Sequence, residues 1–172
     1  MSEIYLVFVV FLFVLAVFDL MVGVSNDAVN FLNSAIGAKV AKFRTIIIVA
    51  AVGVFLGATM SNGMMEVARH GIFHPAMFSF KELIFIFLAV MISDVILLDI
   101  FNNLGLPTST TVSLVFELLG GTTAFVLLKL ANDTTGLTVG DLMNTEKALG
   151  MIMAIFVSVA IAFFFGIVLQ YI

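Results

Sequence analysis

Five apolar stretches, each long enough to cross a lipid bilayer, constrain this chain of 172 residues more than any other feature. They cover roughly residues 4–24, 45–65, 83–101, 112–130 and 148–172. A helix needs about 20 apolar residues to cross a hydrocarbon core of about 30 Å. We predict an all-α, multi-pass integral membrane protein of the cell membrane, with one transmembrane domain over residues 1–172. The first stretch lacks a basic leader and a cleavage site, so we expect it to stay in the protein.

Composition excludes several functional classes. Apolar residues make up 63% of the chain and charged residues 10%, which excludes a soluble globule. Lys and Arg number 7 against 11 Asp and Glu, so there is no basic excess to hold nucleic acid. Cysteine is absent, and no nucleophile–base pair or metal triad can be assembled from the apolar stretches. We therefore expect neither an enzyme nor a cofactor.

Two interruptions in the apolar pattern point towards a transport pathway. Residues Ala28 to Ala38 are too few to cross a membrane and are rich in Asn and Gly, which predicts a half-helix. Residues Asn102 to Thr111 carry Gly105 and Pro107, and here a hairpin within the membrane is as plausible as a surface turn. Broken helices survive at membrane depth only where their backbone is buried in protein or faces water. Two such breaks in one small chain are typical of transporters.

Acidic residues lie among the apolar stretches, whereas the basic residues do not. All seven Lys and Arg lie in loops or at the ends of stretches, and the cluster in residues 39–44 places that loop in the cytoplasm. The acids within or beside the stretches are Asp19, Asp27, Asp94, Asp99 and Glu117. A carboxylate at mid-bilayer costs several kcal/mol, so Na⁺ or H⁺ is the expected counter-charge. We take Asp19, Asp94 and Asp99 as candidate acids of an ion pathway; alternatively, Asp94 and Asp99 are protonated or reach interfacial water.

The first polar motif is a stripe on one helix face. Asn26, Asn30 and Asn33 are spaced by four and three residues, and Asp27 lies beside them. Carboxylate and amide oxygens are ligands for a hard cation, and Asn amides donate to anionic oxygens. We predict Na⁺ at Asp27 and Asn30, with Asn33 on the same cation-binding face. The alternative is that the Asn residues hold helices together through hydrogen bonds.

The second polar motif is a helix start. Pro107 followed by Ser and Thr predicts a helix that begins near Thr108 or Ser109. A buried helix N-terminus with unpaired N–H donors and hydroxyl groups suits phosphate or sulfate. Ser113 and Glu117, four residues apart, continue one face and could reach a cation or proton near the anion. Alone the motif is weak, since ordinary helices also start this way.

Together, the two motifs resemble those of the inorganic phosphate transporter (PiT) family. Its Asn-Asp-x-x-Asn and Gly-x-Pro-x-Ser-Thr-Thr signatures are matched at Asn26, Asp27, Asn30, Gly105, Pro107, Ser109, Thr110 and Thr111, and the resemblance covers roughly residues 10–125. It implies secondary active uptake of inorganic phosphate coupled to Na⁺ or H⁺. It further implies that phosphate is held by Asn26, Asp27, Ser109, Thr110 and Thr111. The coupling cation is then expected at Asp27, Asn30, Asn33 and Glu117.

The chain also departs from the family pattern. Val112 stands where the family usually has His, and Val54 where it often has Glu; both departures bear on the substrate or ion preference of this chain. Family members contain two inverted repeats, and this chain supplies one. We expect the N-terminal repeat of a longer transporter, or a half-size protein that pairs with a companion chain or a second copy as a homodimer. The alternatives are a permease for another oxyanion such as sulfate, and a structural or regulatory membrane subunit.

Overall fold

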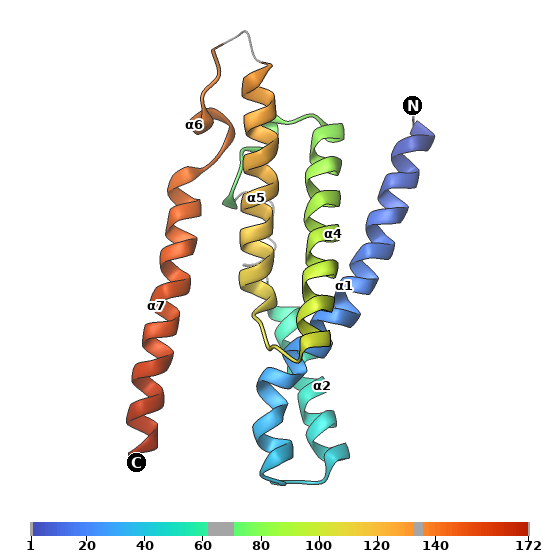
Figure 1. Cartoon of the computed structure of the whole chain (residues 1–172). Helices are drawn as coiled ribbons and strands as arrows, with labels where there is room; N and C mark the ends of the chain where they lie inside the picture. The colour runs from blue at the N-terminus through green and yellow to red at the C-terminus, as the bar shows by residue number, and fades with distance from the viewer. Residues whose placement is uncertain (1, 62–70, 133–135, 172) are drawn as a thin grey trace.

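The computed structural model describes residues 2–61, 71–132 and 136–171, and within them the fold is helical (Figure 1). The long helices are α1 (Ser2–Gly37), α2 (Phe43–Met60), α4 (Phe80–Leu104), α5 (Thr110–Ala131) and α7 (Thr145–Gln170). The short ones are the 3₁₀ helix η2 (Pro75–Met77) and α6 (Val139–Leu142). The five long helices are long and apolar enough to cross a membrane, which confirms the predicted all-α class and the five spans. The end of the predicted span 45–65 lies outside the described residues.

The half-helix predicted over Ala28 to Ala38 is wrong as a separate element. Helix α1 continues through this segment to Gly37, for 36 residues. At 1.5 Å per residue it is about 54 Å long, well beyond a hydrocarbon core of about 30 Å. The ribbon bends on its way (Figure 1). The Ser25 hydroxyl donates to the Met21 carbonyl at 2.8 Å, a contact that bends helices without breaking them.

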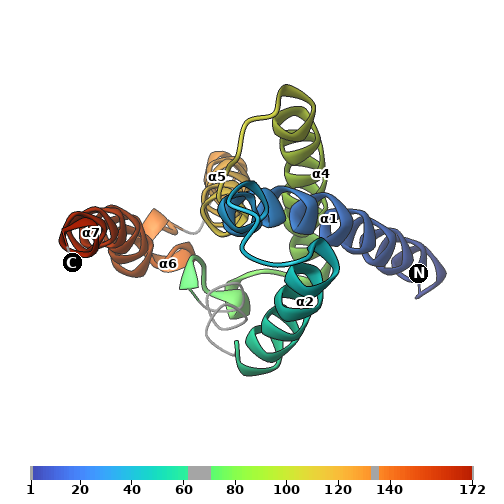
Figure 2. The same cartoon turned by 90° about the horizontal axis from the view of Figure 1, so that it is seen from below.

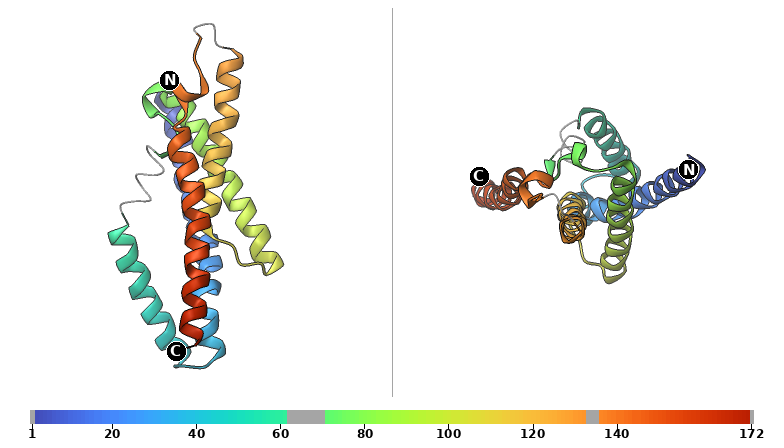
Figure 3. Two further views of the ribbon diagram at one scale, coloured as in Figure 1. Left: turned by 90° about the vertical axis from the view of Figure 1, so that its left-hand side faces the viewer. Right: turned by 90° about the horizontal axis from the view of Figure 1, so that it is seen from above.

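The second predicted interruption is confirmed as a break between helices. Helix α4 ends at Leu104, and Gly105 closes it in the left-handed conformation at φ +66°. Ser109 is the N-cap of α5, and its hydroxyl accepts a hydrogen bond from the Val112 N–H at 3.4 Å, as the Pro–Ser/Thr pattern predicts. The turn lies beside α1, while the α1–α2 turn and the end of α7 extend beyond it (Figures 1 and 3).

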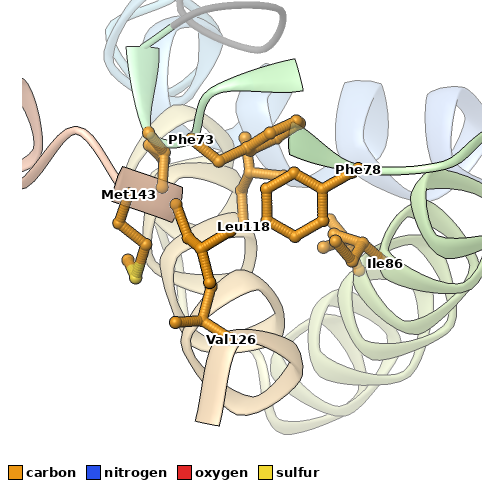
Figure 4. Packing of buried hydrophobic residues seen from close by; sticks show 9 residues of the cluster. Phe73, Phe78, Ile86, Leu118, Val126 and Met143 are labelled. Atoms are coloured by element: carbon orange, nitrogen blue, oxygen red, sulfur yellow. The ribbon is translucent and has the colours of Figure 1, made fainter. Parts of the chain in front are cut away.

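An apolar core lies near the other ends of α4 and α5. Phe73 and Phe78 pack there against Ile86 and Leu118, together with Met143 (Figure 4). Residues 72–74 pair with residues 142–144 through a single antiparallel bridge and two flanking hydrogen bonds. This core joins the loops on that side to α4 and α5 and leaves the opposite ends to the polar motifs.

Next to this core, α6 begins with a capping box. Thr138 donates to the Asp141 carboxylate from its hydroxyl at 2.7 Å and from its N–H at 2.8 Å. These hydrogen bonds hold the pKa of Asp141 below its usual value.

The outer helices bury few of their side chains. Helix α1 packs on α4, and α4 on α5, whereas Ala148 is the buried residue of α7. Figure 2 shows α7 at one side of the molecule. The apolar side chains that remain exposed on α1, α2 and α7 suit contact with lipid or with further protein.

Candidate functional site

A pocket of about 200 Å³ lies where α1 crosses α4 and α5. Its polar lining consists of Asp19, Asp27, Asp94, Thr110 and Thr111. A water molecule occupies about 30 Å³ of liquid, so the space is large enough for a small ion with several waters. Gly23 is buried at its wall, where a Cβ would lie 3.6 Å from Cγ2 of Thr110 and 3.7 Å from Cδ1 of Leu98. A small residue at this position allows α1 to approach the start of α5.

Asn26 fastens the middle of α1 to the α4–α5 turn. Its side chain is 2% exposed, and its Nδ2 donates to Oδ1 of Asn102 at 2.8 Å and to the Leu106 carbonyl at 3.4 Å. Its Oδ1 accepts from the Thr108 N–H at 3.0 Å. Asn102 in turn donates to the Val22 carbonyl at 3.1 Å. The Asn26 amide is therefore occupied by protein groups on both its donor and its acceptor sides.

Two further contacts bring the first motif onto the second. Nδ2 of Asn30 donates to the Thr108 carbonyl at 2.8 Å, and the Thr110 hydroxyl donates to Oδ2 of Asp27 at 3.0 Å. Asn33 is exposed and takes no part in these contacts. Segments about 80 residues apart thus meet at one place, where Asp27 and Asn30 on α1 contact the turn and the first residue of α5.

The first turn of α5 supplies donors for an anion. Thr110 and Thr111 line the pocket and lie at the start of α5. The positive end of the helix dipole therefore lies at the pocket. The Ser109 hydroxyl caps the helix and is exposed together with the turn. Carboxylates, hydroxyls and helix N–H groups therefore share one small space.

The remaining acids fall into two groups. The Asp94 carboxyl is 3% exposed and faces those of Asp19 and Glu117. Glu117 faces Asp94 and also accepts a hydrogen bond from the Ser113 hydroxyl at 3.4 Å, so Glu117 belongs with these acids rather than with the Asn stripe. Asp99 is exposed and accepts from Asn103 at 3.1 Å, away from the pocket lining.

Asn102 is the residue of the site that sequence reasoning missed. It was visible only as the start of the interruption, although it is a polar side chain at the end of an apolar helix. Its role depends on the crossing of α1 over the turn, which no local pattern reveals.

Comparison with known proteins adds a family and several relatives. A family model described as "Phosphate transporter family" matches residues 23–172. A protein of Pyrococcus furiosus is 36% identical over 98 residues, and one of Thermococcus kodakarensis is 33% identical over 98 residues. Each match covers 56% of this chain and 24% of the relative.

A third relative, from Pyrococcus abyssi, is 30% identical over 110 residues, which are 63% of this chain and 27% of the relative. All three carry the provisional name of phosphate permease. The chain thus spans about a quarter of the length of the curated relatives it matches. No solved structure matches it significantly.

Proposed function

Because this chain belongs to the phosphate transporter family, we propose that it forms part of a secondary active transporter that carries inorganic phosphate with Na⁺ or H⁺ across the cell membrane. Its five long apolar helices and its family make it a multi-pass membrane protein. The family is one of transporters and not a class of enzymes. Apart from the coupling ion, the proposed cycle uses no cofactor.

The observation that carries this proposal is the meeting of the two motifs at one pocket. Asp27 and Asn30 on α1 contact the turn and first residue of α5 through Thr108 and Thr110. In the proposed site, phosphate oxygens accept hydrogen bonds from the first turn of α5 and from Ser109, Thr110 and Thr111. Asn26 fixes the turn, and its amide reaches phosphate only by exchanging one of its present hydrogen bonds.

The acids of the pocket explain why a cation would travel with the anion. Asp19, Asp27 and Asp94 line the same space as Thr110 and Thr111. A phosphate anion beside ionised carboxylates is repelled, and more strongly in an apolar setting than in water. A cation bound at Asp27 and Asn30 reduces this repulsion, so anion and cation favour each other's binding. Asn33 and Glu117 lie apart from that pair and are weaker candidates for the same cation.

We further propose that residues 1–172 form one repeat of an inverted-repeat transporter, with the α4–α5 turn as a hairpin within the membrane. The chain spans about a quarter of the relatives, and the α1–α2 turn and α7 extend beyond the α4–α5 turn (Figure 1). A second repeat, or a second copy in a homodimer, would cover the exposed apolar faces and close the site.

Uptake of labelled phosphate tests the proposal. Liposomes that contain the chain together with its second repeat, or as a homodimer, should take up phosphate when an inward Na⁺ or H⁺ gradient is imposed, and an excess of sulfate should compete weakly. Asp27→Ala and Ser109→Ala should each abolish uptake, because each removes an ion ligand, whereas Leu127→Ala on the exposed face of α5 should not. Retained uptake in both site variants would contradict the site. Inserted protein that neither binds nor carries phosphate would contradict the function.

A structural role has one observation in its favour. The Asn26 side chain forms hydrogen bonds between α1 and the turn, as expected of a residue that holds helices together. In a purely structural subunit, replacement of Asp27 would weaken assembly. It would not change cation-dependent phosphate binding.

A further inference from the structure

Three carboxyl groups from three helices meet beside the pocket. Asp19 comes from α1, Asp94 from α4 and Glu117 from α5, and Asp94 faces the other two. Each of the three has one buried oxygen without a hydrogen-bond partner among the described residues. Asp94 is the most enclosed, at 3% exposure, and it lines the pocket together with Asp19. We refer to Asp19, Asp94 and Glu117 as the carboxyl cluster.

No described cation neutralises the carboxyl cluster. The other described charged residues on its three helices are Glu3 and Asp27 on α1, Lys81, Glu82 and Asp99 on α4, and Lys129 on α5. Lys129 is paired with Glu82 at 3.1 Å. Both lysines lie 12 or 13 residues along their helices from the cluster, which is about 18–20 Å. The nearest charged neighbours, Asp27 and Asp99, are themselves acids.

Three neighbouring carboxyl groups cannot all be ionised in a buried position without a cation to neutralise them. Each desolvated charge costs several kcal/mol, and mutual repulsion between neighbouring acids adds to that cost. Neighbouring carboxyls relieve it when one of them carries a proton, which then forms a hydrogen bond to an ionised partner. The oxygens left without a partner are the atoms that such a proton would occupy or bridge.

We propose that the carboxyl cluster is the proton-binding site of the chain, loaded from the pocket and holding at least one proton at neutral pH. The proton comes from water in the pocket and forms an O–H bond on a cluster oxygen; on release it returns to water. Its arrival removes a negative charge beside Thr110 and Thr111, where the anion would bind. The role of the carboxyl cluster in coupling rests on the proposed transport function. Within that function, the cluster is the site of the coupling H⁺.

The geometry favours a proton over a metal ion. Among the described residues no group of three or more His, Asp and Glu side chains has an arrangement that could hold a metal. A bound Na⁺ needs several oxygens around one point, whereas a shared proton needs two.

Infrared titration of the purified chain in lipid tests protonation without any need for transport. Exposed Asp and Glu are ionised at pH 7, because their ordinary pKa values are about 4. We expect the C=O band of a protonated carboxylic acid to persist at pH 7 and to shift in D₂O. Asp94→Asn and Glu117→Gln should each remove or shift this band. The matched control Asp99→Asn should leave it unchanged.

Two outcomes would overturn the proton site. One is the absence of a protonated-carboxyl band at pH 7 in the unaltered chain, which requires no variant to fold. The other is a band that Na⁺, but not choline, removes at constant pH, because the cluster would then take the metal ion.

Uptake driven by a pH gradient separates this inference from the proposed function. If the band is present and Asp94→Asn abolishes uptake, both the proton site and the proposed function are supported. The band in a protein that neither binds nor carries phosphate supports the proton site and contradicts the proposed function. Uptake driven by Na⁺ without any band supports the function and overturns the proton site.

Discussion

Asn102 illustrates how a single polar side chain can hold two helices in this chain. It accepts a hydrogen bond from buried Asn26 and donates one to the Val22 carbonyl. Asn102→Ala should lower the free energy of unfolding by about 0.6–2 kcal/mol, because it leaves the Asn26 amide short of a partner. Denaturant unfolding of the purified protein measures this loss. Asn103→Ala is the control, since Asn103 is exposed and its side chain donates to Asp99 on the same helix; an equal loss there would refute the role of Asn102.

Residue by residue, the sequence identified the polar residues of the first motif better than it identified their partners. Helical spacing predicts that Asn26, Asp27 and Asn30 lie on or beside one face of the helix, and all three contact the turn or the start of α5. The same spacing included Asn33, which is exposed because the turn does not reach that far along α1. Glu117 joins Asp94 and Asp19 only because three helices cross there, and no pattern within one helix encodes that crossing.

Among the elements, the α4–α5 turn depends on one backbone conformation. Gly105 has φ +66°, and no atom outside its own neighbourhood would meet a Cβ there. Gly105→Ala should therefore cost about 1–2 kcal/mol through strain alone. Gly120 in α5 is equally open but helical, so Gly120→Ala should be neutral or stabilising by about 1 kcal/mol. Thermal unfolding compares the two, and equal shifts would disprove the strain.

Helix boundaries lie at the predicted positions where the sequence contains a residue that interrupts helices. Gly105 and Pro107 marked the break between α4 and α5, and Ser109 marked the start of α5. Residues 28–38 resembled a half-helix only because their Asn and Gly content lowers hydropathy. No Pro interrupts them, and the Asn30 amide finds a partner on the turn, so the helical backbone continues to Gly37.

For the whole molecule, the order of helices fixes which loops share a side of the membrane. The α1–α2 turn and the end of α5 lie at opposite ends (Figure 1). Because the chain has no cysteine, single cysteines report their position without background. Lys42→Cys should react with an impermeant maleimide from the cytoplasmic side, and Asn132→Cys from the other side. Labelling of both from one side would contradict this arrangement, and the unaltered chain should remain unlabelled.

The hydrogen bond between Asp27 and Thr110 has a consequence for how the two ions influence each other. It joins a group proposed for the cation to one proposed for the anion, so these two groups satisfy each other. Whichever ion arrives first must break this bond, and the second ion finds its ligand already released. Such a shared bond makes binding cooperative: with a net strength of about 1 kcal/mol, each ion would raise the affinity for the other about fivefold. The linkage is reciprocal, so the pocket favours being either empty or fully occupied.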